Sequence, residues 1–454
     1  MSSRGIENQF MDGEPPSKRV ALTAGLVLTV VSIAFEGLAV PTVMPTVARE
    51  LGGLKAYGWV FSAFMIANIV AITATGQRTD LKGPLGAFAA GLLLFGLGLG
   101  LGGSAPSMAA LIAARIIQGF GGGALSAVVY ACVARAYPTE QQPRMLALLS
   151  TAWVVPGLIG PALSGIVADH FGWRFVFFGL LPPLPIVAIL TLPVLRCLPP
   201  VTMAAPFENR LGSAVLLAAG LVALLLGLQS PLFPSRLGSL VFGSAATVYG
   251  LGRLMPAGTL KVQPGLPAAL VAMGLICVAF FGAETLIPLL LTSLRHQSLA
   301  AAGSALTAAT LTWTTGAWVQ ARLAKSRSRR ALVAAGAGLI AIGVASVASL
   351  LPEATPTATA WIAWGVTGLG MGIAHAATSL TVLEHAPAGA EGAASAALQL
   401  ANVVGVALGA GIAGAMIADF GPAVSGFALA FGLMTAAALL AVATAIRLPG
   451  LARA

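Results

Sequence analysis

The chain has 454 residues, of which 58 % are apolar and 8 % are charged, and it contains 55 glycines. A soluble domain carries about 25 % charged residues, so this composition excludes a soluble globule and indicates an all-α polytopic membrane protein. The net charge of +10 does not indicate a partner nucleic acid, because the basic residues are spread over many loops and form no compact face.

Apolar runs separated by short polar loops predict fourteen membrane spans. The run at 237–252 is only just long enough to cross a bilayer, and twelve spans is the alternative if it and its neighbour at 211–229 are both omitted. The fourteen spans are expected at 20–47, 56–77, 84–104, 107–134, 144–168, 172–195, 211–229, 237–252, 265–294, 299–321, 331–351, 357–383, 392–418 and 422–446.

The spans group into two six-helix bundles related by pseudo-two-fold symmetry, with two extra linker helices between them. Glu36 is followed by Pro41 and Glu284 by Pro288, each late in the first helix of its set, as in transporters built from repeats. The expected parts are an N-terminal tail at 1–19, a bundle at 20–195, a two-helix linker at 196–264, a bundle at 265–447 and a tail at 448–454.

The distribution of basic residues predicts the orientation. With the N-terminus in the cytoplasm, most of the 24 Lys and Arg residues fall in cytoplasmic loops, including the cluster RLAKSRSRR at 322–330. This excess agrees with the positive-inside rule. We therefore expect a multi-pass protein of the cell membrane, in contact with the lipid bilayer, with both termini cytoplasmic.

Two acidic residues lie at bilayer depth. Of the 14 acidic residues, only Glu36 and Glu284 fall inside apolar spans. A carboxylate there costs about 2.5–3.5 kcal/mol on insertion scales, so it is retained where something uses it. For Glu284 a structural role remains open, in which a helix backbone or a neighbour such as His375 satisfies the carboxyl group. The pair indicates a protein that moves protons.

Four local motifs resemble those of the major facilitator superfamily, and in particular its fourteen-span branch of drug:proton antiporters. They are the loop GQRTDLKGP at 76–84, the run RIIQGFGGG at 115–123, the run PGLIGPALSG at 156–165, and the stretch from Glu36 to Pro45. The first departs from G-x-L-A-D-R-x-G-R/K in its displaced basic residues. The third has Pro and Ser in place of two glycines, and the fourth has Glu in place of Asp.

The resemblance implies roles for particular residues. It implies that Arg115 lies near Glu36, which makes these two residues candidates for coupling transport to protons. Glu284 joins them because of its depth in the membrane: as a functional acid it would bind a cationic substrate or carry a second proton. It also implies a conformational latch, formed by Gly76, Asp80 and Gly83, whose alternative is a solvated loop ion pair. The antiporter motif implies a tight helix contact that serves export, whereas ordinary small-residue packing is the alternative; its residues are Gly157, Gly160, Pro161 and Gly165.

Polar and aromatic residues in the spans are candidates for lining a substrate cavity. Polar groups there would fix the orientation of a ligand, and aromatic rings would supply contact area. For the tryptophans and the histidine, helix packing is the alternative. The candidates are Asn68, Gln118, Trp153, Trp313, His375 and Asn402.

The sequence contains none of the patterns of a soluble enzyme. It has no phosphate-cradling GK[ST] loop, no metal-ligand cluster and no nucleophile–base pattern. The three cysteines, Cys132, Cys197 and Cys277, have no metal-ligand spacing and suggest no disulfide framework. We therefore expect no enzyme, no cofactor and no metal, which leaves an ion gradient as the energy source.

These observations predict a proton-coupled secondary transporter that exports amphipathic or cationic drugs and toxic compounds by alternating access, with protons and a small-molecule substrate as partners. One alternative is a major facilitator transporter of a specific metabolite, lipid or siderophore. Another is a membrane scaffold or sensor without turnover, which the acids at depth argue against, because a scaffold does not need to bear their insertion cost.

Overall fold

A computed structural model describes residues 16–138, 141–198, 210–324, 326–387 and 391–448 of the chain. Within these ranges the regular structure is entirely helical, without a strand. Most of the predicted N-terminal tail and nearly all of the C-terminal tail lie outside the described residues. The expectation of an all-α membrane protein is confirmed.

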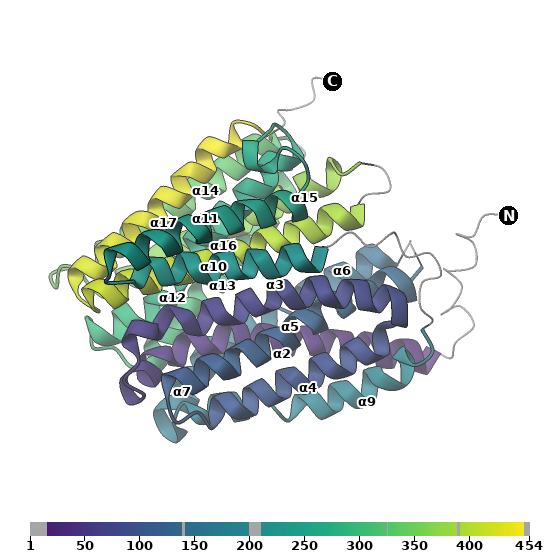
Figure 1. Ribbon diagram of the computed structural model, residues 1–454. Helices are drawn as coiled ribbons and strands as arrows, with labels where there is room; N and C mark the ends of the chain where they lie inside the picture. Colours follow the sequence, from purple (N-terminus) through teal and green to yellow (C-terminus); the bar gives the residue numbers. More distant parts are fainter. Residues whose placement is uncertain (1–15, 139–140, 199–209, 325, 388–390, 449–454) are drawn as a thin grey trace.

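The first six predicted spans form the N-terminal bundle. Its spans run alternately in opposite directions between the two ends of the molecule (Figure 1). Their bounds are α2 (Pro16–Glu50), η1 (Leu54–Ala56), α3 (Tyr57–Lys82), α4 (Pro84–Gly103), α5 (Met108–Ala136), α6 (Gln142–Thr151), α7 (Val154–Phe171), α8 (Arg174–Phe178) and α9 (Pro183–Leu195).

The remaining helices form a peripheral pair and the C-terminal bundle. The pair consists of α10 (Arg210–Gln229) and α11 (Phe233–Leu254), followed by the short η2 (Thr259–Lys261). The C-terminal bundle consists of α12 (Leu266–Ser293), α13 (Leu299–Leu323), α14 (Arg329–Ala348), α15 (Thr359–Glu384), α16 (Glu391–Phe420) and α17 (Val424–Ala445).

Two of the predicted spans are each interrupted. The span expected at 144–168 breaks between α6 and α7, because Pro156 has no amide hydrogen to donate to an earlier carbonyl. The span expected at 172–195 breaks between α8 and α9, where Pro182 and Pro183 follow one another and Pro183 begins the new helix. The apolar runs of the sequence predict neither break.

The number of spans depends on α11 and α13. Twelve stretches of the described helices are long and apolar enough to cross a membrane, and these two helices are not among them. Helix α11 has 22 residues, which gives a length of about 33 Å, enough for a hydrocarbon core of about 30 Å. Helix α13, with 25 residues, joins α12 to α14, which run in the same direction (Figure 1). The fourteen-helix architecture is present, and two of its helices are less apolar than the rest.

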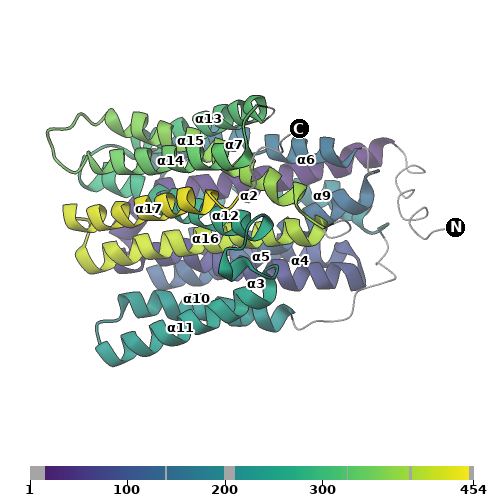
Figure 2. The same ribbon diagram turned by 90° about the horizontal axis from the view of Figure 1, so that it is seen from above.

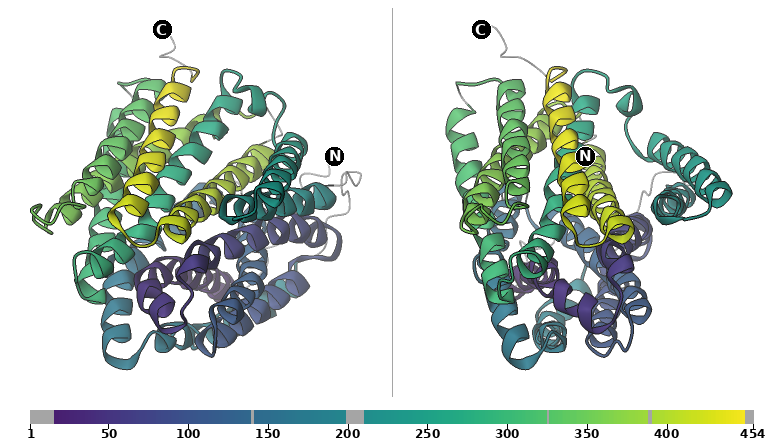
Figure 3. Two further views of the ribbon diagram at one scale, coloured as in Figure 1. Left: turned by 60° about the vertical axis from the view of Figure 1, so that its left-hand side comes forward. Right: turned by 90° about the vertical axis from the view of Figure 1, so that its left-hand side faces the viewer.

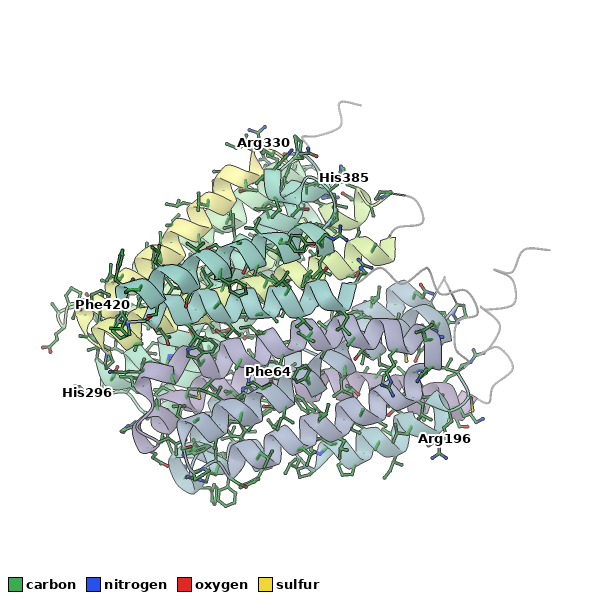
Figure 4. The ribbon with its side chains drawn as sticks, in the orientation of Figure 1. Phe64, Arg196, His296, Arg330, His385 and Phe420 are labelled. Carbon is green, nitrogen blue, oxygen red and sulfur yellow. The ribbon has the colours of Figure 1, made fainter. Side chains whose placement is uncertain are left out.

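The two bundles lie one above the other (Figure 1), and the peripheral pair runs along one edge (Figures 2 and 3). The start of α2 and the end of α17 lie toward the same end of the molecule, which we call the terminal end, and the opposite end is the far end. Figure 4 shows Arg196, Arg330 and His385 at the terminal end and His296 and Phe420 at the far end.

Glycines in α5 bring three helices of the N-terminal bundle into close contact. A Cβ atom on Gly119 would lie 2.3 Å from the carbonyl oxygen of Phe64 in α3. A Cβ atom on Gly121 would lie 2.3 Å from the amide nitrogen of Phe95 in α4. Small residues permit such close approach of backbones in lipid. This packing places the preceding turn of α5, which carries Arg115, against α3.

Candidate functional site

A buried ion pair joins α2 and α5 at the centre of the N-terminal bundle. Glu36 is 1 % exposed and Arg115 is 3 % exposed, and the Arg115 Nη1 group donates a hydrogen bond to Glu36 Oε1. The structure therefore brings together the two residues that the motif resemblance places near one another. Because the guanidinium does not lose its proton in proteins, the carboxyl group is the member of the pair that can change charge.

The other contacts of Arg115 hold the guanidinium in place. Its Nε donates to the carbonyl oxygen of Val60 at 3.0 Å, and its Nη1 donates to Gln118 Oε1 at 2.6 Å. Its Cζ atom lies 4.3 Å from the ring centre of Phe64, which is labelled near the middle of Figure 4. A buried pair is more stable when its remaining donors find acceptors, and α3 and α5 supply two of these acceptors and an aromatic ring.

Two candidate cavity residues of the N-terminal bundle are buried in packing. Gln118 is fully buried, and its Nε2 atom has no hydrogen-bond partner among the described residues. Asn68 is 7 % exposed and lies against the glycines of α5, with its Nδ2 atom 3.5 Å from a Cβ position on Gly122. In this conformation Gln118 belongs to the ion-pair cluster and does not line an open cavity.

Three other candidates meet in the C-terminal bundle. His375 Nε2 lies 3.3 Å from Asn402 Nδ2, and the rings of His375 and Trp313 are 5.6 Å apart between centres. The Trp313 ring in turn packs edge-on against Phe280 of α12, with centres 5.3 Å apart. The structure therefore gathers residues of α12, α13, α15 and α16 into one aromatic cluster.

Glu284 lies in α12, one turn after Phe280. It is 7 % exposed and has no hydrogen-bond or ion-pair partner among the described residues. His375 is therefore not its partner in this conformation, and its own contacts are Asn402 and Trp313. Glu284 is a buried acid without a counter-charge, unlike Glu36.

Trp153 stands apart from the other candidates. It is 46 % exposed and lies at the break between α6 and α7. Among the described residues it makes no ring contact with the cluster around Trp313. The structure therefore does not bring Trp153 together with the remaining cavity candidates.

The predicted latch lies at the terminal end between α3 and α4. Gly83 has a φ of +79°, a left-handed conformation that glycine adopts without strain, and it is the N-cap residue of α4. Gly76 faces open space, since no atom lies within 4 Å of its Cβ position. Arg135 donates to the carbonyl oxygen of Thr79 at 3.3 Å. The side chain of Asp80 lies outside the described residues, so the latch stays a prediction.

The antiporter motif forms a tight contact between the bundles. A Cβ atom on Gly157 would lie 2.1 Å from Thr310 Cγ2, and one on Gly165 would lie 2.6 Å from the carbonyl oxygen of Leu299, both in or at the start of α13. The carbonyl oxygen of Pro161 lies 2.3 Å from a Cβ position on Gly303. Gly160 instead faces Phe35 of α2. The close helix contact expected from this motif is present.

Three polar contacts between the bundles lie toward the far end, and none of them was predicted from the sequence. Tyr57 donates to the carbonyl oxygen of Thr285 at 2.9 Å, and Ser62 donates to that of Ala407 at 2.8 Å. The amide of Ala300 donates to Asp169 Oδ2 at 3.2 Å. Each contact involves a main-chain group, which any residue could supply, so no sequence signal identifies the partner.

Two six-helix bundles that enclose charged residues at membrane depth define the class of membrane transporters built from repeats. Among the described residues, no group of three or more His, Cys, Asp and Glu side chains could hold a metal ion. The family model described as "Major Facilitator Superfamily" matches residues 25–410. The chain belongs to this superfamily.

Relatives of the chain carry transporter names. It is 28 % identical over 423 residues to a Mycobacterium tuberculosis protein named "probable multidrug-efflux transporter", covering 88 % of this chain and 89 % of the relative. It is also 28 % identical over 213 residues to the "multidrug transporter protein MdtP" of Bacillus subtilis, covering 47 % and 39 %.

Solved structures with the same fold are also transporters. A POT family transporter in complex with 5-aminolevulinic acid has a TM-score of 0.68 and 12 % identity, covering 96 % of this chain and 97 % of that one. A D-xylose-proton symporter has a TM-score of 0.62 and 15 % identity, covering 95 % and 97 %. At this identity the likeness shows the fold alone.

Proposed function

We propose that the protein is a proton-coupled secondary transporter that exports amphipathic or cationic compounds by alternating access. The observation that carries the proposal is the buried pair of Glu36 and Arg115, because it combines a group that can bind a proton with a charge that opposes protonation. The names of the multidrug relatives support this substrate class and the direction of transport.

The pair can exchange protons because two physical effects act on the carboxyl group in opposite directions. Burial in a low-dielectric interior favours the neutral acid, whereas contact with the guanidinium favours the carboxylate. A movement that separates Glu36 from Arg115, or admits water to them, therefore changes the affinity of the carboxyl group for a proton. Protons would load in one access state and leave in the other, in exchange for substrate.

The C-terminal bundle offers the groups expected of a site for cationic aromatic compounds. Glu284 supplies an acid without a counter-charge, and Phe280 and Trp313 supply aromatic surface nearby in the fold. Aromatic faces attract cations, and a mainly apolar site with few polar groups admits ligands of varied shape. We assign Glu284 to substrate or a second proton, and His375 and Asn402 to the same lining.

The proposal includes a placement in the cell membrane with both termini cytoplasmic, so that the terminal end faces the cytoplasm. In this orientation, the polar contacts between the bundles described above lie toward the outer side. Asp80, together with Gly76 and Gly83, would then latch the cytoplasmic side in the opposite access state.

Transport of a specific metabolite, lipid or siderophore is the second candidate. A site for one metabolite usually presents several convergent charges, whereas the described cluster around Trp313 is mainly aromatic. A non-transporting scaffold would not need Glu36 and Glu284 at membrane depth.

The test is transport into or out of proteoliposomes under an imposed pH gradient, with a panel of lipophilic cations. We expect flux that follows the gradient, and loss of that dependence in Glu36→Gln with substrate binding preserved. Glu50→Gln is the matched control, because Glu50 ends the same helix but forms an exposed pair with Arg174. Unaltered pH-driven flux in Glu36→Gln removes Glu36 as the proton carrier. Absence of stimulated flux across the panel favours the metabolite transporter.

A further inference from the structure

The first turns of α3 are where the N-terminal bundle meets the C-terminal bundle. Tyr57 and Ser62 are both fully buried, and each donates its hydroxyl hydrogen to a carbonyl of the other bundle, in α12 and in α16 respectively. Between them, a Cβ atom on Gly58 would lie 2.7 Å from the carbonyl oxygen of Ala410 and 2.8 Å from the Cα atom of Gly414. The backbones of α3 and α16 therefore touch at this point.

The first turns of α3 also contact the peripheral pair. Trp59 Nε1 donates to Gln229 Oε1 of α10 at 2.9 Å. Leu225 of α10 also reaches the contact between the bundles, where its Cδ2 atom is 2.5 Å from a Cβ position on Gly411 of α16. Apolar residues of α3, α10 and α16 form a buried cluster of their own. Helix α10 thus packs against both bundles along the contact (Figure 2).

The segment also touches the ion pair. The carbonyl oxygen that accepts from Arg115 Nε belongs to Val60, between Tyr57 and Ser62, and Phe64 lies under the guanidinium. Arg115 is the one charged group that contacts Glu36 among the described residues. Residues 57–64 of α3 therefore contact the ion pair on one side and the other bundle on the other.

We propose that residues 57–62 of α3 form a second latch, distinct from the loop with Asp80, which holds the far end closed. The charge of Glu36 controls this far-end latch through Arg115 and Val60. When Glu36 accepts a proton, Arg115 loses its anionic partner and its guanidinium turns toward other acceptors. This movement alters the hydrogen bond from Arg115 Nε to the carbonyl oxygen of Val60. This proposal rests on the proposed function, since it supplies the step that links proton binding to opening.

The two hydrogen bonds of the far-end latch, donated by Tyr57 and Ser62, can break and form again at low cost. The carbonyl groups of Thr285 and Ala407 lie inside helices, where an amide of the same helix is already a donor. On opening, only the two hydroxyl groups need new partners, and entering water supplies them. Loss of either hydrogen bond is therefore expected to shift the equilibrium constant between the closed and open far end about two- to tenfold toward open.

The test measures exposure of the far-end contact in full-length protein in detergent micelles. Cys132, Cys197 and Cys277 are replaced by alanine, and Thr42→Cys is the reporter. Thr42 is fully buried, and its Cγ2 atom is 3.0 Å from a Cβ position on Gly303 of the other bundle. Its rate of reaction with a water-soluble maleimide reports opening.

We expect Tyr57→Phe to raise the labelling rate about two- to tenfold. Tyr137→Phe is the matched control, because its hydroxyl lies 2.8 Å from Thr23 Oγ1 within the N-terminal bundle, and it leaves the rate unchanged. Ser62→Ala repeats the test at the second contact should Tyr57→Phe fail to fold. Equal labelling rates in Tyr57→Phe, Ser62→Ala and the parent would contradict the proposed far-end latch.

Control by the ion pair is tested by adding Glu36→Gln, which mimics the protonated acid. We expect this variant to raise labelling in the parent and to have a smaller effect when Tyr57→Phe is already present, since coupled sites are non-additive. If the two substitutions instead raise the labelling rate by factors that multiply in the double variant, the ion pair does not control the latch. The assay needs no transport, so failure of proton-coupled flux with these labelling differences intact refutes the proposed function and leaves the latch standing.

Discussion

The side chain of Arg115 donates a hydrogen bond to the carbonyl oxygen of Val60 at 3.0 Å, which ties the buried ion pair to helix α3. The guanidinium thus donates both to the Glu36 carboxylate and to a main-chain carbonyl three residues after Tyr57, in addition to Gln118. Any change in the charge of Glu36 acts on a helix that contacts the other bundle.

Removal of Arg115 is expected to destabilise the protein strongly. Arg115→Ala leaves Glu36 buried without a counter-charge, which costs about 3–5 kcal/mol. Thermal unfolding in detergent measures the loss, and Glu36→Gln in the same chain should recover part of it. Arg174→Ala is the control, because that residue is 42 % exposed and its pair with Glu50 is worth about 0–1 kcal/mol. Equal stability of Arg115→Ala and Arg174→Ala would contradict the expectation.

A methyl group at Gly157 is expected to force α7 and α13 apart. Its Cβ atom would lie 2.1 Å from Thr310 Cγ2, and such overpacking costs about 1–3 kcal/mol. Thr310→Ser removes the clashing methyl group and should restore both stability and transport in the double variant. Gly86→Ala is the control, since nothing lies within 4 Å of that Cβ position. Failure of Thr310→Ser to rescue would place the effect outside this contact.

Glu284→Gln is expected to weaken binding of cationic substrates while leaving proton coupling through Glu36 intact. Hydrogen bonds to charged groups are worth about 1.5–3 kcal/mol, so the loss in affinity should be about 10- to 100-fold. Binding of a lipophilic cation and of a neutral compound of the same shape, measured by calorimetry, separates charge from packing. Equal losses for the two compounds would show that Glu284 does not act through its charge.

Asp169 is expected to stabilise the far-end contact through its hydrogen bond to the Ala300 amide, at the start of α13. Asp169→Ala should cost about 0.5–2 kcal/mol, as for other residues that cap helix N-termini. Asp169→Asn keeps a side-chain oxygen that can accept the bond and should cost less. Thermal unfolding distinguishes the two, and identical losses would show that the hydrogen bond contributes nothing.

Much of the helical map follows from composition. The predicted span at 84–104 differs from the observed α4 by one residue, and the span at 211–229 differs from α10 by one residue. The breaks near Pro156 and Pro182 were missed, because the flanking apolar runs are long enough to span in spite of them. Domain boundaries at 195 and 265 stay predictions.

The candidate site was predictable where a residue was anomalous in its own helix. Glu36 and Arg115 could be singled out because a charge in an apolar span needs a partner. That they are partners of each other was implied by the motif resemblance. Gln118 is a cavity candidate by its polarity, and in this conformation it is buried against Arg115. Polarity alone does not say which face of a helix a side chain occupies relative to its neighbours.

The sequence by itself determined that this is an all-helical membrane protein with acids at depth, because backbone groups in lipid must be satisfied within helices and charges there are costly. Only the tertiary structure decided that Arg115 reaches Val60, and that Tyr57 and Ser62 reach carbonyls of the other bundle. The physical reason is that a main-chain carbonyl is the same at every residue, so its partner is chosen by the packing of helices distant in sequence.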